Sequence, residues 1–437
     1  MKTIKMTPIA LAVMAASTSS VYAVDINLYD MDSPQSIEAV KKMHESLAVS
    51  GTEEFKVYTH TAIEIEQEIK REDPASNGDS YDTFDNEVEF GIGAEIGEQW
   101  SGYFEMELDK LADESSRRVR DGKTGDLEVR SAYVDWKGDK ARARVGVYRP
   151  DLEGKTRLFF REDSTMARYN YSFDSGLRAE AGTAIFTEYG DSFSEDRQLT
   201  WVTAALNDFY MTQALGQQTG EGTPTLDAAD GDDFGDLYNL AAGWKGKLGS
   251  FKAQFEFNQQ FGEATTGEKY KGQAVYAEVS TKLAGHEPHL LFAWGSGDDD
   301  ATDNDVNEFQ EFASDFRGTK MLLDEGFIEN ISTSGVGGLG EGRRGIGNVT
   351  LIQAGNTFNV NPVWEVQATA SYLALSEDND NGDNYLGTEF NIINRWEVSP
   401  IKAARIRLYL DLAYLSAGNA FGPDDLWMVE PGVRVEF

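Results

Sequence analysis

The chain has 437 residues, 75 of them acidic and 39 basic, and it contains no cysteine. The net charge of −36 excludes nucleic acid and anionic membrane surfaces as electrostatic partners, and the lack of cysteine excludes a fold held by disulfide bonds. The 24 Phe, 18 Tyr and 8 Trp exclude a disordered acidic protein, whereas 43 glycines among so many aromatic residues are typical of many short strands joined by turns.

Residues 1–23 have the pattern of a secretory signal peptide. Lys2 and Lys5 give a positive start, residues 9–16 are apolar, and Val21-Tyr22-Ala23 has small residues at the two positions that a signal peptidase reads. The apolar run is far below the ~20 residues that a membrane-spanning helix needs, so we expect cleavage after Ala23. Loss of the two lysines leaves 37 basic residues against 75 acidic ones, a mature charge of −38.

Residues 24–53 are predicted to form a leader with a short helix. Ser33-Pro34 is typical of a helix start, and Ile37, Val40, His44 and Leu47 follow at helical spacing before Gly51. Two alternatives are open: a loosely packed leader helix, or a piece that rests at the mouth of the following domain.

From Phe55 to the end, the pattern predicts strands. The clearest pair flanks Gly138-Asp139: before the break Ala132, Val134 and Trp136 alternate with polar residues, and after it alanines and valines alternate with Arg142 and Arg144. One face is wet and the other wholly apolar. About 18 such strands are predicted: 55–69, 86–97, 99–109, 127–137, 140–149, 167–173, 177–186, 198–206, 209–216, 237–245, 250–261, 273–283, 289–295, 346–360, 363–375, 386–398, 402–416 and 427–437.

The connections between these strands alternate between short and long. Tight turns such as Gly97-Glu98, Gly138-Asp139 and Asn207-Asp208 alternate with long polar stretches such as 217–236 and 296–345. Short turns at one rim and long loops at the other are typical of transmembrane barrels. The sequence therefore predicts an all-β fold, a transmembrane antiparallel up-and-down β-barrel of 16–18 strands over residues 54–437, wide enough for an aqueous channel.

Two local features resemble Gram-negative outer-membrane porins. The hairpin YVDWKGDKARARVGVYR is similar to the porin hairpin that leads into a loop folded back into the pore, and Phe437 at the end of an alternating strand resembles the assembly signal of outer-membrane proteins. The resemblance implies a location in the bacterial outer membrane, a periplasmic leader, passive diffusion of small hydrophilic solutes and ions, and a homotrimer surrounded by lipid and lipopolysaccharide. No nucleic-acid partner is expected.

If loop 150–166 enters the lumen as in porins, its charged residues constrict the pore. The alternative is an extracellular loop tied by its own salt bridges. The residues predicted for the constriction are Arg142, Arg144, Arg149, Asp151, Glu153, Arg157, Arg161, Glu162 and Asp163. Strand alternation predicts a pore lining that includes Glu64, Glu66, Glu87, Glu89, Glu105, Glu107, Arg405 and Arg407. Acidic residues outnumber basic ones on the predicted inner faces, which predicts a preference for cations.

Little in the chain points to catalysis, so we expect no enzyme. His60 has no evident nucleophile near it, and His286 and His289 fall at a predicted periplasmic turn. Residues 378–383 with Glu389 look like a calcium loop, but glycine stands at the fifth place instead of the sixth. Loose Ca²⁺ binding at this tip or at residues 298–305 and a plain solvated loop are equal alternatives; we expect no other cofactor or metal.

Three functions remain open. The leading hypothesis is a general diffusion porin. The second is a substrate-selective channel for sugars or an acidic polysaccharide, and the third is a structural or adhesive barrel. The long loop 296–345 could cap the channel mouth or grip a neighbouring subunit.

Overall fold

The alternating segments fold as strands of one continuous sheet. The computed structural model describes residues 50–52, 55–71, 80–109, 126–149, 152, 156–161, 164–186, 196–219, 235–264, 267–299, 303–312, 316–324, 345–378, 382–401, 404–421 and 425–437. The expected signal peptide and leader helix lie outside this part of the chain. Among the described residues, no helix is long and apolar enough to cross a bilayer.

Eighteen long strands span the sheet, as the sequence predicted. They are β2 (Phe55–Arg71), β3 (Ser80–Ile96), β4 (Trp100–Asp109), β5 (Asp126–Lys137), β6 (Ala141–Tyr148), β7 (Ser164–Ser172), β8 (Leu177–Phe186), β9 (Asp196–Leu206), β10 (Phe209–Thr219), β11 (Asp236–Leu248), β12 (Phe251–Glu263), β14 (Gln273–Thr281), β15 (His286–Gly295), β17 (Val349–Asn361), β18 (Trp364–Leu375), β19 (Tyr385–Ile401), β20 (Ala404–Ala417) and β21 (Leu426–Glu436).

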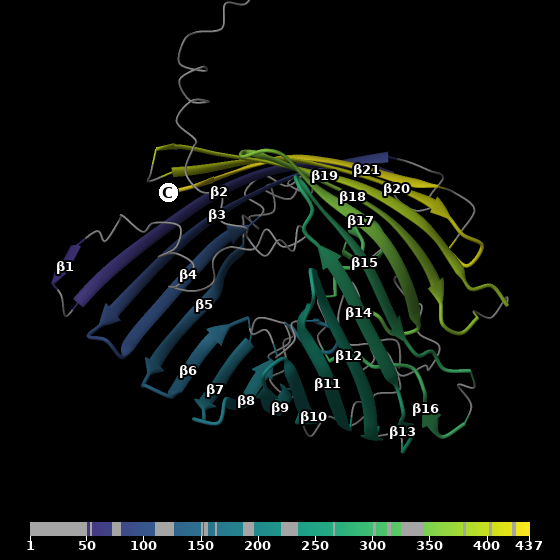
Figure 1. Cartoon of the computed structure of the whole chain (residues 1–437), viewed down its shortest axis with the longest axis horizontal. Helices are drawn as coiled ribbons and strands as arrows, with labels where there is room; N and C mark the ends of the chain where they lie inside the picture. Colours follow the sequence, from purple (N-terminus) through teal and green to yellow (C-terminus); the bar gives the residue numbers. More distant parts are fainter. Residues whose placement is uncertain are drawn as a thin grey trace, which may run out of the picture.

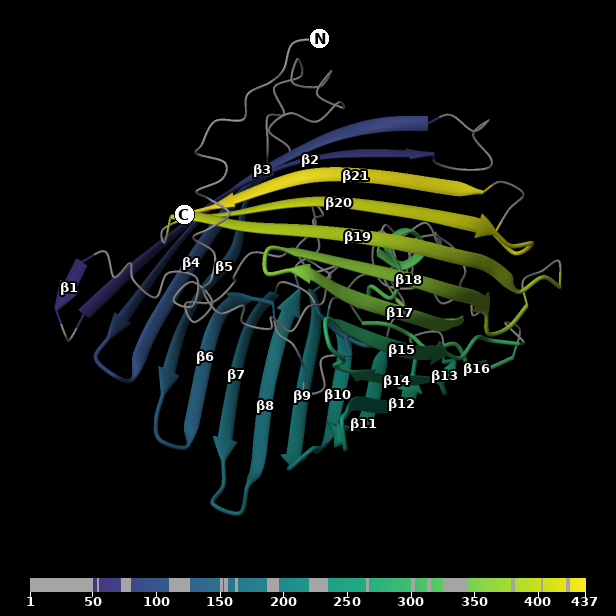
Figure 2. The same cartoon turned by 45° about the horizontal axis from the view of Figure 1, so that its top comes forward.

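The sheet closes into a barrel. Each long strand pairs antiparallel with the next one along the chain, and the last strand, β21, pairs with the first, β2, from Ala62↔Glu436 to Arg71↔Trp427. Figure 1 shows β21 beside β2 and β3, and Figure 2 shows the long strands around the interior. Closure leaves no open edge among the long strands, as a structure in lipid requires.

Four short elements accompany the long strands in the described part of the chain. Strand β1 (Ser50–Thr52) folds back on the start of β2, so the end of the predicted leader is a strand. Strands β13 (Lys269–Tyr270) and β16 (Asp305–Val306) pair in parallel. The one described helical element is the single-turn π-helix η2 (Lys320–Asp324).

Alternation along each strand separates an apolar outer face from a polar inner face. Large apolar side chains are exposed on the outside, for example Ile63, Ile65, Phe90 and Phe255. The next residues along the same strands point inward and are buried, as Glu64, Glu89 and Glu256 are. This is the pattern of an outer-membrane barrel.

Tight turns join the strands at one rim. At Asn207 and Gly249 the backbone adopts φ of 54° and 65°, the left-handed conformation that asparagine and glycine tolerate best and that narrow hairpins require. The connections at the other rim are longer, and one of them contains residues 303–324. The predicted loop asymmetry is therefore present.

The C-terminal residue belongs to the seam between β2 and β21. The backbone N–H of Phe437 donates to the Thr61 carbonyl (2.9 Å), and the Thr61 N–H donates back (2.8 Å). The role of Phe437 as an assembly signal stays a prediction.

Deleting Phe437 should lower the amount of folded barrel in the outer membrane, because the seam loses two backbone hydrogen bonds and an exposed aromatic side chain. The measurement is the heat-modifiable band on gels of outer-membrane fractions. Phe437→Tyr is the matched control and should assemble normally. Normal assembly of the deletion variant would show that Phe437 is not an assembly signal.

Candidate functional site

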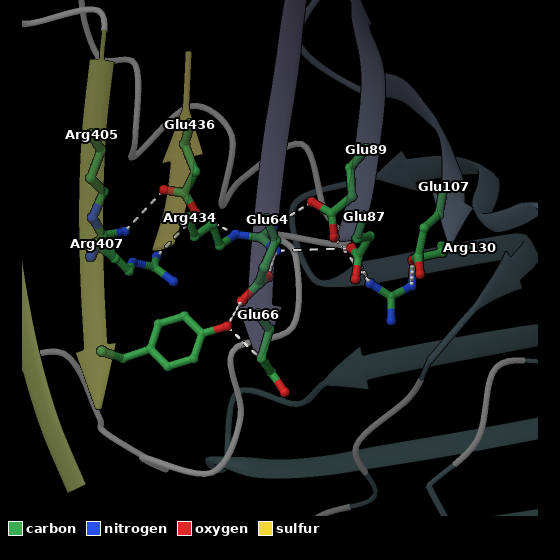
Figure 3. Close-up of polar contacts among 11 residues, drawn as sticks. Glu64, Glu66, Glu87, Glu89, Glu107, Arg130, Arg405, Arg407, Arg434 and Glu436 are labelled. Atoms are coloured by element: carbon green, nitrogen blue, oxygen red, sulfur yellow. Dashed lines mark hydrogen bonds and ion pairs between the residues drawn. The ribbon is translucent and has the colours of Figure 1, made fainter. Parts of the chain in front are cut away.

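One side of the inner surface carries a dense network of ion pairs, which we call the charged wall. It spans strands β2 to β5 and β20 to β21 (Figure 3). Its members are Glu64, Glu66, Glu87, Glu89, Glu107, Arg130, Arg405, Arg407, Arg434 and Glu436. Cross-strand pairing brings them together: Glu64 lies opposite both Arg434 and Glu87, and Glu89 lies opposite Glu107.

Arg434 is the centre of this network. Its side chain is 1% exposed, and its guanidinium group contacts three carboxylates from three strands. Nη1 donates to Glu64 Oε2 (2.6 Å), Nε donates to Glu436 Oε1 (3.0 Å), and Nη2 donates to Glu89. Because the fixed fork of a guanidinium suits several carboxylates at once, Arg434 holds β21 to β2 and β3 across the closing seam.

Arg130 neutralises the other end of the wall. Its Nη1 lies 3.0 Å from Glu89 Oε1 and 3.4 Å from Glu87 Oε1, and its Nε contacts Glu107. The register shifts here: Glu105 pairs with Ser131 and Met106 with Val129, so Arg130 is the extra residue of a β-bulge. The bulge turns Arg130 inward, although strict alternation would place it toward lipid.

The carboxylates of Glu87, Glu89 and Glu107 lie close enough together to hold a metal ion, with ligand atoms within 4.8 Å of one another. The guanidinium group of Arg130 already contacts all three. It supplies the positive charge that such a cluster needs, so this arrangement explains the trio without a metal.

The wall keeps a small negative surplus, with six carboxylates against four guanidinium groups. Half of these charges are shielded, since five of the ten side chains are buried: Glu64, Glu89, Glu107, Arg434 and Glu436. The Tyr409 hydroxyl lies 2.8 Å from Glu64 Oε1 and 2.7 Å from Glu66 Oε2, so its single proton serves two carboxylates. The predicted surplus of acids on the inner face is therefore largely compensated by partners.

A second group of charges, the arginine strip, lies on β6 and β7 and consists of Arg142, Arg144 and Arg168. Arg142 Nε donates to Asp135 (2.9 and 2.8 Å), and Arg168 pairs with Glu180 at 2.5 Å. Arg144 lies over the Tyr133 ring, 4.0 Å from its centroid. Within the part of the chain that the structure describes, the carboxylate partners of these three guanidinium groups are Asp135 and Glu180.

Inner segment A, residues 156–161, is packed against the inner surface of the barrel. Leu158, Phe159 and Phe160 are buried, and the Phe160 ring lies 6.4 Å from that of Trp201 on β9. Arg157 adopts φ of 63°, a conformation that a non-glycine residue takes only when its surroundings impose it. The described part of loop 150–166 therefore lies inside the barrel; that its charged residues constrict the pore stays a prediction.

Inner segment B, residues 307–312 and 316–324, follows β16 at the rim and lies within the barrel, where the coil of η2 appears in Figure 2. Polar side chains on the inner faces of the barrel strands bind the backbone of inner segment B. Gln260 donates to the Gln310 carbonyl and accepts from its N–H (2.8 Å), and Gln353 donates to the Gly318 carbonyl (2.7 Å). Phe309, Phe312, Phe316 and residues 321–323 form its buried apolar side.

The two inner segments meet. The Phe312 N–H donates to the Phe159 carbonyl (3.0 Å), and their rings lie 6.1 Å apart. The described part of loop 296–345 therefore packs beside inner segment A through Phe159 and Phe312. That this loop caps the channel mouth or grips a neighbouring subunit stays a prediction.

Several predicted site residues lie where the sequence placed them. Glu64, Glu66, Glu87, Glu89, Glu105, Glu107, Arg405 and Arg407 sit on inner faces of β2, β3, β4 and β20. Arg142 and Arg144 lie on β6, Arg149 directly follows it, and Arg157 and Arg161 belong to inner segment A. Asp151, Glu153, Glu162 and Asp163 lie outside the described residues. That solutes meet these side chains stays a prediction.

Glu389 is not a loop ligand for calcium. It lies on β19 inside the barrel and accepts the backbone N–H groups of Met321 (2.9 Å) and Leu322 (3.0 Å). Loose Ca²⁺ binding at the acidic loop tips stays a prediction, and part of each tip lies outside the described residues. His286 begins β15 directly after a tight turn, as predicted, but the same prediction is wrong for His289, which lies within β15 with its Nε2 3.2 Å from Gln353 Oε1.

Comparison with known proteins supports the fold. Neither a protein-family model nor a curated protein sequence matches the chain, but solved structures do. Pseudomonas aeruginosa OccK11 (OpdR) has a TM-score of 0.55 at 10% identity, over 87% of this chain and 96% of that one. P. aeruginosa OpdK with vanillate has a TM-score of 0.57 at 11% identity, over 87% of this chain and 98% of that one. Acinetobacter baumannii OccAB4 has a TM-score of 0.53 at 10% identity, with the same coverage of the two chains. OpdK is described as an outer membrane protein.

The fold is that of a Gram-negative outer-membrane porin. The resemblance seen in the hairpin and in Phe437 is confirmed at the level of the fold, and the expected outer-membrane location agrees with it.

Replacing Arg434 with Met should lower the free energy of unfolding by about 3–5 kcal/mol, because three buried carboxylates lose their shared cation. Denaturant unfolding in detergent, followed by tryptophan fluorescence, measures the loss. The control is Lys140→Met: Lys140 is 45% exposed and its partner Asp174 86%, so about 0–1 kcal/mol is expected. Equal effects of the two changes would contradict the central role of Arg434.

Proposed function

We propose that this chain forms a water-filled channel in the bacterial outer membrane, surrounded by lipid and lipopolysaccharide. Small hydrophilic solutes and ions would diffuse through it passively. The observation that carries the proposal is the closed barrel of 18 long strands with an apolar outside, an ion-paired inside and two segments that narrow it. A barrel of this strand number is too wide to be filled by its own side chains, so narrowing must come from inserted chain.

A preference for cations belongs to the same proposal. The whole chain carries −36, and the charged wall keeps two more carboxylates than guanidinium groups. A lumen with one excess sign concentrates ions of the opposite sign, and salt screens this effect over ~10 Å at 0.1 M.

In a tenfold KCl gradient across a planar bilayer, the reversal potential should have the sign of cation selectivity, and selectivity should fade at molar salt. Glu66→Gln with Glu87→Gln should weaken it, since these two carboxylates are partly exposed. Arg144→Gln, the matched loss of a positive charge, should strengthen it. An anion-selective sign for the unaltered protein would refute the cation preference.

A substrate-selective channel for sugars or an acidic polysaccharide is the second candidate. The arginine strip favours it: Arg144 stacks on Tyr133 and lies 5.2 Å from the Tyr148 ring centroid, so cations and aromatic faces are presented together. One similar structure, OpdK, is of a complex with vanillate. Liposome swelling with neutral and acidic sugars of equal size separates the candidates, because a general porin distinguishes them by charge only at low salt.

We also propose that the channel is a homotrimer. The outer faces of β6, β7 and β8 carry small residues where other strands carry Ile, Leu and Phe: Ala141, Ala143, Ala167, Ala179 and Ala181. Small side chains allow close approach between the backbones of two barrels in lipid.

Native mass spectrometry in detergent should therefore give a mass of three chains. Ala143→Trp and Ala181→Trp, which place bulk on this face, should shift the complex toward single chains. Ala242→Trp, on the outer face of β11, is the control and should leave the mass unchanged. A single-chain mass for the unaltered protein would refute the trimer.

A further inference from the structure

Each inner segment is bound to the barrel by a buried carboxylate on the inner face of a long strand. Glu256 on β12 holds inner segment A. It is 4% exposed and accepts hydrogen bonds from the Thr156 hydroxyl (2.6 Å), the Tyr210 hydroxyl (2.6 Å) and the Asn258 amide (2.9 Å). All three of these donors are uncharged, and only Thr156 belongs to the segment. A buried carboxylate is unstable without hydrogen-bond donors. Withdrawal of inner segment A would remove the hydrogen bond from Thr156 and leave the Glu256 carboxylate with fewer donors.

Glu389 on β19 holds inner segment B in the same way. Its two oxygens accept the backbone N–H groups of Met321 and Leu322, and its side chain is fully buried. The neighbouring Lys320 adds an ion pair to Glu430 on β21, with Nζ–Oε distances of 3.0 and 3.1 Å. These charge-assisted hydrogen bonds are among the strongest contacts that a loop makes with a wall.

The two attachments act on one body, because the segments contact each other through Phe159 and Phe312. The Phe312 ring also lies against Gly216 of β10, where an added Cβ atom would come within 2.4 Å of the ring. Glycine at this position is therefore what lets inner segment B settle against inner segment A.

We infer that Glu256 and Glu389 are positioning residues that clamp the two inner segments into one constriction, so that release at either carboxylate widens the channel. This inference rests on the proposed channel function. In this inference, two carboxylates that are shielded from solvent determine the pore diameter. They act in addition to the partly exposed charged residues that the sequence predicted for the pore.

Single-channel conductance and the size cutoff for neutral sugars test the clamp. Thr156→Val removes a hydroxyl without changing charge. Gly216→Ala adds a methyl group on β10 that would clash with the Phe312 ring. Both should raise the conductance and the cutoff, as should Glu389→Ala. The reference is deletion of Glu153–Glu162, expected to raise conductance about twofold or more because a barrel of this size is wide once emptied.

Glu397→Ala is the matched control, because it removes an inner carboxylate from the same strand as Glu389 but at a site bonded to Arg405. It should leave the size cutoff unchanged. The double variant Thr156→Val with Glu389→Ala should add little to either single change if the segments move as one body. Wild-type cutoffs in Thr156→Val, Gly216→Ala and Glu389→Ala would overturn the clamp.

A second measurement does not depend on conduction. The chain has no cysteine, so Leu322→Cys introduces a single thiol in a fully buried place. Reaction of this thiol with a water-soluble thiosulfonate should be slow alone and faster when Thr156→Val or Glu389→Ala is added. An unchanged rate would overturn the clamp. A protein that shows the faster labelling but no conductance would refute the proposed function instead.

Discussion

The requirement that every backbone group in lipid be paired within the protein governs this structure. A strand edge inside a bilayer costs several kcal/mol for each unpaired group, so the last long strand must return to the first. Here β21 pairs with β2, and Phe437 and Thr61 exchange two hydrogen bonds at the seam. Arg434 adds a three-way ion pair at the same place, so the junction farthest apart in sequence is also the one with the most concentrated electrostatic contacts.

Closure of the barrel also determines which way the charged side chains of the strands point. Because the outer face must be apolar, the ionised side chains of the charged wall and of the arginine strip are directed inward, where they meet others of opposite sign. The result is a charged wall in which Arg434 and Arg130 bridge carboxylates from neighbouring strands, and an arginine strip in which Arg142 and Arg144 pair with Asp135 and Arg168 pairs with Glu180.

The width of the barrel creates the need for the inner segments. Side chains alone leave a wide channel, and the two segments narrow it by packing phenylalanines on each other and on the wall. Their polar backbone groups must then be satisfied away from bulk water. The wall supplies partners for them: Gln260 and Gln353 bind backbone groups, Glu389 accepts two N–H groups, and Glu256 accepts the Thr156 hydroxyl. These side chains face inward for the same reason as the ion pairs do.

The sequence by itself determined the architecture. Period-2 alternation marks all 18 long strands and the side that each residue faces, because a strand between lipid and water has no other stable pattern. The sequence could not place Arg130, because a β-bulge breaks the alternation at that residue, nor could it predict that Glu256 and Glu389 bind loops. The contacts of these two carboxylates with the inner segments join residues 67 to 100 positions apart and depend on how far the barrel shears before it closes. Only the tertiary structure brings Thr156 to Glu256, residues 321–322 to Glu389, and Phe159 to Phe312.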